Sequence, residues 1–293
     1  IFTSEECKEE LKSKGVVLSS ANSINFGRLA PQIAYYFSAY LDLVSSEQIK
    51  MGDAVDFAVP TGNFGNILAA YYAKRMGLPV GKLICASNKN NILTDFIRTG
   101  TYDKRREFYK TMSPSMDILI SSNLERLLFE LSGREPKRVK MRMDKLAAEG
   151  VYEIYDEERE ELEKLFWADF CGEDETVETI YEFFEEYQYP MDTHTACAMY
   201  AAANYMAGEE TKDGNPMVVV STASPYKFPQ DVMYAVTGND IKDSFKAIKH
   251  LNIATAMKVP ASLSKLRDKP IRFKETADKD KLYAEVLKFV DKK

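Results

Sequence analysis

One stretch of the sequence, residues 55–77, constrains the fold more than any other. It begins with a short run of mostly apolar, β-forming residues (55–59), which is typical of a strand buried in a sheet. Residues 67–76 carry strong helix formers, and Gly77-Leu78-Pro79 closes them in the way that helices usually end. Residues 60–66 lie between the two and contain two glycines and two asparagines. We therefore expect a strand, a tight turn and a helix.

The turn between this strand and helix has the sequence Pro60-Thr61-Gly62-Asn63-Phe64-Gly65-Asn66. A glycine-containing turn lets the backbone approach a ligand, and the following helix points its free N–H groups and positive dipole end at that ligand. This is the architecture of a phosphate site. Any tight turn also needs Asn and Gly, because they tolerate positive φ, so spacing alone leaves both interpretations open. The turn matches neither the Walker pattern nor the Rossmann G-x-G-x-x-G, which disfavours an ATPase or a nicotinamide-dependent dehydrogenase.

The sequence continues to alternate between strand-like and helix-like segments. We expect strands at residues 83–86, 117–120 and 216–220, and helices at residues 92–98, 123–130 and 196–207. Such alternation indicates an α/β fold with a parallel, doubly wound sheet. Ligands bind to these sheets at the carboxyl ends of the strands, where the polar loops 60–66 and 87–91 are expected.

A second candidate site lies closer to the start of the sequence. Residues 15–18 favour a short strand, and a polar loop leads from them into a helix. The apolar residues of that helix recur at steps of three and four: Phe26, Leu29, Ile33, Phe37, Leu41 and Val44. Asn22, Ser23 and Arg28 cluster at its N-terminus, where an anion is favoured. The alternative is that Asn22 or Ser23 only caps the helix and that Arg28 is solvated.

Residues 134–189 differ in character from the rest of the chain. They are dense in Glu and Asp, and their aromatic and aliphatic residues recur at helical spacing. We interpret them as a helical insertion with a solvated acidic face and assign them no chemistry.

Two hydroxyl groups follow the last predicted strand. Ser221 and Thr222 come directly after residues 216–220, so we expect their hydroxyls to face the ligand crevice. Ser224 and Pro225 have a structural explanation as the N-cap and the first residue of a helix.

Histidines and cysteines are too few or too scattered for a metal site or a disulfide framework. The only histidines are His194 and His250, which makes a His-rich metal site implausible. Asp192 or Thr193 is expected to cap the helix at 196–207, and we assign His194 a structural hydrogen-bonding role. We expect reduced, buried or half-buried thiols at Cys7, Cys85, Cys171 and Cys197.

The composition excludes several classes of function. The 293 residues, 45% of them hydrophobic, provide ample core for one large or two moderate domains. The net charge of −6, with no dense Lys/Arg block, argues against general nucleic-acid binding. No apolar run approaches the roughly 18 residues that span a bilayer, and the acidic start resembles no secretion signal. We therefore expect a cytoplasmic protein without a membrane partner.

Three of these segments together resemble one enzyme family. They are residues 22–28, 60–66 and 221–228, and residues 192–196 resemble the same family. The family is threonine synthase, in the longer branch that is found in many bacteria and in fungi. The order and approximate spacing of the segments agree with that family over about residues 10–235.

The resemblance implies a pyridoxal 5'-phosphate (PLP) enzyme of fold type II, the tryptophan-synthase-β-like superfamily. The family converts O-phospho-L-homoserine and water to L-threonine and inorganic phosphate. The residues implied to hold the PLP phosphate are Thr61, Gly62, Asn63, Phe64, Gly65 and Asn66. Thr222, with Ser221, is implied to hydrogen-bond the pyridine nitrogen. Asn22, Ser23 and Arg28 are implied to bind the phosphate of the substrate.

The sequence departs from the family pattern in one important respect. The Schiff-base lysine of the family lies in a Phe-Lys-Asp type motif well before the Asn-Ser-Ile-Asn segment, and this chain contains no such motif. Lys89 and Lys227 lie near predicted ligand loops but lack the required context. A smaller departure is Ser224, where many relatives carry His. We therefore expect the C-terminal portion of a threonine synthase that is inactive alone, with its catalytic lysine upstream.

We divide the chain into four parts. Residues 1–133 and 190–238 are the first and last parts of the PLP-binding large domain, residues 134–189 are the helical acidic insertion, and residues 239–293 are the C-terminal tail. Loss of a domain interface would expose apolar surface, so we expect a homodimer or a sticky monomer. Two alternatives stay open. One is a related PLP-dependent phospho-lyase that acts on another phosphorylated amino acid, and the other is a non-catalytic module that binds a phosphorylated ligand.

Overall fold

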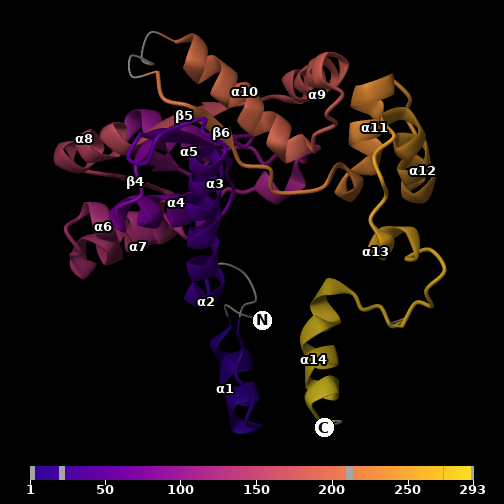
Figure 1. Ribbon diagram of the computed structural model, residues 1–293. Coiled ribbons are helices and arrows are strands. Elements are labelled where there is room, and N and C mark those ends of the chain that lie inside the picture. The colour runs from indigo at the N-terminus through magenta and orange to yellow at the C-terminus, as the bar shows by residue number, and fades with distance from the viewer. Residues whose placement is uncertain (1–3, 20–23, 209–213, 273, 292–293) are drawn as a thin grey trace.

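The computed structural model describes residues 4–19, 24–208, 214–272 and 274–291. In chain order its elements are α1 (Glu5–Ser13), α2 (Phe26–Leu29), η1 (Ala30–Gln32), α3 (Ile33–Ser45), β1 (Val55–Pro60), α4 (Gly65–Arg75), β2 (Val80–Ser87), α5 (Ile92–Thr99), β3 (Thr101–Asp103), η2 (Pro114–Met116), α6 (Leu124–Leu131), α7 (Pro136–Glu149), β4 (Val151–Glu153), α8 (Asp156–Leu165), β5 (Phe166–Phe170), α9 (Glu173–Tyr187), α10 (Thr193–Ala207), β6 (Met217–Val219), η3 (Pro225–Lys227), α11 (Pro229–Thr237), α12 (Ser244–Thr255), α13 (Ala261–Ser264), η4 (Lys279–Lys281) and α14 (Leu282–Asp291). Figure 1 shows the sheet among helices, with α1 and α14 projecting away from it.

Four strands form the central sheet in the order β5-β2-β1-β6, and each neighbouring pair is parallel. In the register of β1, Phe57 pairs with Leu83 of β2 and with Val218 of β6. Every residue of β1 is buried, as its apolar sequence predicts for a central strand. The predicted parallel α/β sheet is therefore confirmed. Because the strands are parallel, the loops that follow β1, β2 and β6 emerge at one edge.

Helices cover both faces of the sheet. On one face, the alanines of α10 pack against Ala58 and Ile84, where small side chains let the helix approach closely. On the other face, α3 and α4 contribute buried side chains that include Tyr36 and Ile67. Complete burial of a large apolar side chain stabilises a fold by roughly 1.5–3 kcal/mol. These two layers hold the β1 strand and the α4 helix, and thus the loop between them, in fixed positions.

The segment at residues 117–120 is not a strand, which corrects the sequence prediction. The Asp117 carboxylate instead accepts hydrogen bonds of 2.7–3.0 Å from the backbone N–H and hydroxyl of Thr111 and from the side-chain amides of Asn88 and Asn90. These contacts hold the segment in an irregular loop beside the end of β2.

The edge position of the sheet beside β2 belongs to β5 instead. This strand lies inside the acidic stretch that was predicted to be helical. The helical prediction is right for α7, α8 and α9 but wrong for two short segments. Residues 151–153 form β4, which pairs with β3, and the main chain of residues 166–170 pairs with β2, where Ala168 lies opposite Cys85. The division of the chain into domains stays a prediction.

The first helical region also differs from its prediction. Residues 15–18 form no strand, and Val17 is 84% exposed. The helix that follows consists of α2, a 3₁₀ turn that contains Pro31, and α3. Phe26 and Leu41 of the predicted apolar stripe are exposed, and the fully buried positions are Leu29, Tyr36 and Tyr40.

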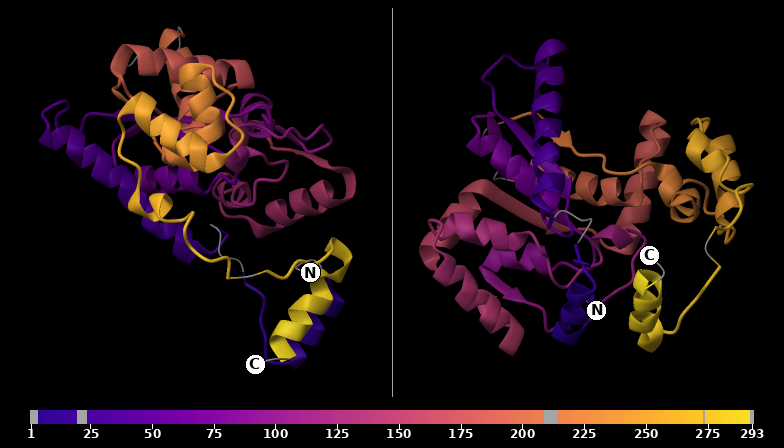
Figure 2. Two further views of the ribbon diagram at one scale, coloured as in Figure 1. Left: turned by 90° about the vertical axis from the view of Figure 1, so that its right-hand side faces the viewer. Right: turned by 90° about the horizontal axis from the view of Figure 1, so that it is seen from below.

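The first and last helices meet away from the sheet, and the left view of Figure 2 shows them together. Lys14 Nζ lies 2.6 Å from Asp291 Oδ1, and the Tyr283 hydroxyl donates a short hydrogen bond to the Glu10 carboxylate. A second hydrophobic cluster joins α9, α11 and α12, which lie next to one another in Figure 1.

Candidate functional site

The carboxyl edge of the sheet carries a cleft of about 240 Å³. The β1–α4 loop (residues 61–66) forms one side of it, together with the flanking Pro60 and Ile67. The lining is completed from other elements by Gln32, Ser115, Met116, His194 and Thr222. Parallel α/β sheets bind ligands at this edge. The cleft thus brings the predicted phosphate loop and Thr222 together.

The backbone N–H groups of residues 62–67 are the main chemical feature of this cleft. None of them donates to an acceptor within the described ranges of the chain. The neighbouring donors are paired, since Thr61 N donates to Ala86 O at 2.8 Å. Leu68 N similarly donates to Phe64 O at 3.1 Å. A run of unpaired donors at the N-terminus of α4 favours an anion.

The carbonyl groups of the same loop are held from outside the cleft. Ser121 Oγ donates to Gly62 O at 3.0 Å. Asn123 Nδ2 donates to Asn63 O at 2.9 Å, and its backbone N–H donates to the same oxygen at 3.2 Å. The acceptors of the loop are therefore satisfied by the start of α6, whereas its donors are left for a ligand.

Contacts at both ends of the loop fix its position. A Cβ atom at Gly62 would lie 2.8 Å from Ser115 O and 3.2 Å from Met116 Cα, so only glycine allows this approach. At the other end, the hydroxyl of the buried Tyr36 lies 2.8 Å from Asn66 Oδ1. The loop is thus clamped between the 3₁₀ turn η2 and helix α3.

The end of β6 supplies a hydroxyl-bearing residue on another side of the cleft. Thr222 lines the cleft, whereas Ser221 does not, and the Oγ of Ser221 lies 3.4 Å from Thr195 Oγ1. Ser224 Oγ accepts a hydrogen bond from Tyr226 N at 3.3 Å, which confirms its predicted role as a cap.

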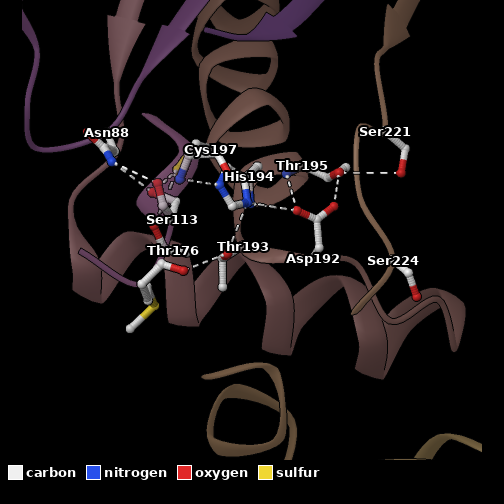
Figure 3. Close-up of polar contacts among 12 residues, drawn as sticks. Asn88, Ser113, Thr176, Asp192, Thr193, His194, Thr195, Cys197, Ser221 and Ser224 are labelled. Atoms are coloured by element: carbon white, nitrogen blue, oxygen red, sulfur yellow. Dashed lines mark hydrogen bonds and ion pairs between the residues drawn. The ribbon is translucent and has the colours of Figure 1, made fainter. Parts of the chain in front are cut away.

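The first turn of α10 forms a buried polar network beside the cleft (Figure 3). Asp192 caps this helix, as predicted, by accepting hydrogen bonds from the backbone N–H groups of His194 and Thr195. Burial raises the pKa of Asp192, but the hydrogen bonds from His194 and Thr195 outweigh this effect and hold the pKa below its ordinary value. His194 has the predicted hydrogen-bonding role, since it also accepts from Ser115 N at 3.1 Å.

The structure describes the second predicted site only at Arg28. Asn22 and Ser23 lie outside the described residues. Arg28 is exposed and does not line the cleft. One turn further along, Gln32 lines the cleft, and its Nε2 donates to Arg28 O at 2.6 Å. The segment that contains Arg28 therefore runs past the cleft without presenting its guanidinium group there.

Arg126 of α6 connects this segment to the β1–α4 loop. Its Nη2 donates to Ile24 O at 2.5 Å, and its Nη1 donates a short hydrogen bond to Asn123 Oδ1. Asn123 in turn holds Asn63 O. A larger cavity of about 700 Å³ lies beside Arg126 and Phe26, away from the strand ends. One arginine thus ties together both segments that were predicted to bind phosphate.

Neither lysine near the predicted ligand loops lies in the cleft. Lys89 Nζ is 4.2 Å from the centre of the Tyr109 ring, and Lys227 Nζ is 5.3 Å from the centre of the Phe228 ring. No lysine occurs among the described residues that line the cleft.

Sequence reasoning missed Gln32, Ser115 and Met116 as lining residues. Ser115 and Met116 belong to a loop without hydrophobic periodicity, so the sequence contains no signal that brings them to Gly62. Gln32 lies one turn after Arg28, and the helical spacing of that region could have identified it.

Other kinds of site find no support in the part of the chain that the structure describes. No group of His, Cys, Asp or Glu side chains within these residues could hold a metal ion. In the same ranges, no helix is long and apolar enough to cross a membrane. The four cysteines are free and buried, as predicted.

Comparison with known proteins points to one family. The family model described as "Threonine synthase, C-terminal" matches residues 195–290. The chain is 40% identical over 242 residues to the threonine synthase of Pseudomonas aeruginosa, and this alignment covers 80% of this chain and 50% of that protein. It is 45% identical over 232 residues to Threonine synthase-like 1 of Homo sapiens, and this alignment covers 78% of this chain and 30% of that protein.

Solved structures give the same result. The PLP-bound threonine synthase of Brucella melitensis superimposes with a TM-score of 0.80 at 36% identity, covering 99% of this chain and 55% of that one. The yeast threonine synthase superimposes with a TM-score of 0.79 at 31% identity, covering 94% of this chain and 54% of that one. The chain therefore spans about half the length of the threonine synthases that it matches.

Proposed function

We propose a function from the premise that this chain belongs to the threonine synthase family. The reaction that we propose for the protein is the PLP-dependent conversion of O-phospho-L-homoserine and water to L-threonine and phosphate. This chain would contribute the loop that holds the cofactor phosphate and the residues that face its ring. The lysine that binds the cofactor would come from a region equivalent to the part of the relatives that this chain does not span.

One observation carries the proposal, namely the unpaired N–H groups of residues 62–67. A phosphate monoester is a compact anion with several acceptor oxygens, and successive N–H groups at a helix N-terminus match it. Gly62 and Gly65 leave this part of the loop without side chains that would cover the donors. The Thr222 residue supplies a neutral hydroxyl in the same cleft. These residues fit PLP.

The cofactor residues that we propose are Thr61, Gly62, Asn63, Phe64, Gly65, Asn66, Ser221 and Thr222. When bound, PLP supplies the electron sink for reactions at the carbon atoms of an amino-acid substrate. Thr222 would hydrogen-bond the pyridine nitrogen through a neutral group, which leaves the ring less electron-withdrawing than a carboxylate partner would. Ser221 would support Thr222 through its contact with Thr195.

Asn22, Ser23 and Arg28 are proposed to hold the phosphate of the substrate. Arg28 offers a bidentate fork for phosphate oxygens. The hydrogen bond from Arg126 to Ile24 O would keep this segment beside the β1–α4 loop.

The proposal is tested first with this chain alone. The chain is mixed with PLP, reduced with borohydride and analysed by mass spectrometry, since borohydride makes any lysine–PLP linkage permanent. We expect PLP binding, seen by fluorescence, without a stoichiometric adduct on a single lysine. A single stoichiometric adduct would show that the chain carries its own catalytic lysine. Protein that includes the complementary region should then form threonine from O-phospho-L-homoserine, and binding of PLP without this turnover would contradict the proposed reaction.

A second candidate is a related phospho-lyase that acts on another phosphorylated amino acid. It is favoured by the 45% identity to a protein named Threonine synthase-like 1, beside 40% to a threonine synthase. Turnover of another phosphorylated amino acid, with none of O-phospho-L-homoserine, would select it. A third candidate, a non-catalytic module, predicts binding of phosphate without turnover of either substrate. The cytoplasmic location and the homodimer stay predictions.

A further inference from the structure

Asp192 is fully buried, and both oxygens of its carboxylate accept hydrogen bonds. Oδ1 lies 2.9 Å from His194 N and 3.1 Å from His194 Nδ1. Oδ2 accepts a short hydrogen bond from Thr195 Oγ1. Figure 3 shows the carboxylate between these two side chains. A buried charge requires such partners, and here they also connect it to the cleft.

The contacts of His194 determine which nitrogen of its ring carries the hydrogen atom. Ser115 N donates to Nε2 at 3.1 Å. A backbone N–H group can only donate, so Nε2 is the acceptor and carries no hydrogen. The hydrogen of the neutral ring therefore lies on Nδ1, where Asp192 accepts it. The Nε2 lone pair is engaged by the main chain and is not available to carry a proton.

Ser115 is the point at which this pair reaches the cleft. Its N–H is held by His194, and its carbonyl oxygen would lie 2.8 Å from a Cβ at Gly62. The two groups belong to one residue of the short turn η2. The hydrogen bond to His194 therefore sets how closely η2 lies against the β1–α4 loop.

The same carboxylate also reaches the end of β6. Thr195 has a single hydroxyl hydrogen, and the carboxylate of Asp192 can only accept it. The same hydroxyl also faces Ser221 Oγ at 3.4 Å, where Thr195 is again the donor, so its one hydrogen atom is shared between the carboxylate and Ser221. Ser221 directly precedes Thr222, so the carboxylate is linked to two sides of the cleft.

We propose that Asp192 and His194 are a positioning pair that shapes this cleft. Asp192 fixes the Nδ1–H form of His194, and His194 then holds the Ser115 backbone against Gly62 of the loop. Neither residue acts as a proton carrier in this arrangement. The inference rests on the proposed function in one respect, because it takes the cleft to be the site of the PLP phosphate.

The first test uses the unmodified chain. Long-range ¹⁵N–¹H NMR distinguishes the two neutral forms of a histidine ring, and the chain has only two histidines. The exposed His250 serves as the internal reference. We expect His194 to be neutral with hydrogen on Nδ1. A spectrum that places the hydrogen on Nε2, or that shows a doubly protonated ring at neutral pH, would overturn the proposal.

The second test compares two substitutions at one position. In His194→Gln the amide oxygen reaches the position of Nε2 and can accept from Ser115 N, whereas the shorter side chain of His194→Asn cannot. We expect hydrogen exchange of the Ser115 amide to be about tenfold faster in His194→Asn than in His194→Gln, as loss of one hydrogen bond implies. His250→Asn is the control and should change nothing. Equal exchange rates in the two His194 variants would contradict the positioning role.

A PLP titration connects this pair to the proposed function. PLP should bind about tenfold more weakly to His194→Asn than to His194→Gln, because the loop is no longer held from η2. If the unmodified chain binds neither PLP nor inorganic phosphate, the proposed function fails, while the NMR and exchange measurements still decide whether the pair positions Ser115.

Discussion

The β1–α4 loop and the segment around Arg28 are both proposed to bind phosphate, but the protein builds them in different ways. The loop offers main-chain N–H groups, and neighbouring residues hold its carbonyl groups in place. Arg28 offers an exposed side chain on α2, a helix of 4 residues. The loop is therefore preorganised within this chain, whereas the arginine is not.

This difference has an energetic basis. An arginine side chain loses roughly 2 kcal/mol of rotamer entropy when it is held in one geometry. Backbone donors at the N-terminus of a packed helix have already lost their freedom on folding. We therefore expect the loop to bind an anion without further partners. The Arg28 segment would bind phosphate only when other groups hold both the segment and its ligand.

The largest effect is expected from a substitution of Gly62 in the loop, with Gly27 in the Arg28 segment as the matched control. Gly62→Ala would place a Cβ 2.8 Å from the Ser115 carbonyl oxygen, whereas Gly27→Ala would meet only the Asn25 side chain, at 3.2 Å. Gly62→Ala should lower the free energy of unfolding by about 1–3 kcal/mol and weaken PLP binding at least about tenfold. Gly27→Ala should change the free energy by less than about 0.5 kcal/mol. Urea unfolding and fluorescence titration measure both quantities, and similar results for the two variants would remove the distinction between the regions.

The next effect concerns acid stability. The pKa of Asp192 is lower in the folded protein than its ordinary value. Its carboxylate therefore stabilises the fold above the unfolded-state pKa of about 4, and this contribution is lost as the pH falls through the folded-state pKa. Asp192→Asn keeps a good helix cap but removes the charge. It should lower the free energy of unfolding at pH 7 by about 1–3 kcal/mol.

The pH profile supplies the check on this prediction. Between pH 5 and pH 2, unfolding free energies of Asp192→Asn should decline less steeply than those of the unmodified chain. Parallel profiles would mean that Asp192 does not titrate with a lowered pKa.

A smaller and more local effect is expected at Arg126. Arg126→Gln shortens the side chain that reaches Ile24 O and Asn123. Amide exchange at residues 26–28 should accelerate about fivefold, because about 1 kcal/mol of hydrogen bonding is lost there. Residues 62–67 should change less, since Asn123 still holds Asn63 O. Equal acceleration in both segments would show that the two regions are not independent.

The smallest effect on this chain is expected from Arg28→Ala. The side chain is exposed, so the free energy of unfolding should stay within about 0.5 kcal/mol and PLP affinity should not change. In protein that turns over O-phospho-L-homoserine, the same change should raise KM for this substrate, and Arg28→Lys should restore part of the loss. An unchanged KM would exclude Arg28 from the substrate phosphate site.

Elements whose contacts join residues close together in the chain can be predicted from the local sequence. The unit β1–loop–α4 follows from an apolar run, a glycine turn and a helix-forming run, and α10 with its Asp192 cap follows from similar signals. The motifs at residues 22–28, 60–66 and 221–228 are enough to indicate the family, because three of them occur in the same order and at similar spacing.

The remaining features depend on contacts between distant parts of the chain. The strand β5 was missed because its aromatic residues also fit helical spacing, and pairing with β2 decides the outcome. Residues 117–120 look like a strand, but hydrogen bonds to the Asp117 carboxylate hold them as a loop. The contact of Ser115 with Gly62 and His194 arises from the same irregular region and has no local signal.

Anion binding by the β1–α4 loop is tested most directly by an amide NMR titration of this chain with PLP, and separately with inorganic phosphate. We expect saturable shifts at the backbone N–H groups of residues 62–67 with both ligands, and at Thr222 with PLP. Resonances of residues 24–28 should stay in place. Saturable shifts at residues 24–28 or elsewhere, with residues 62–67 unchanged, would contradict the assignment of the β1–α4 loop as the anion site.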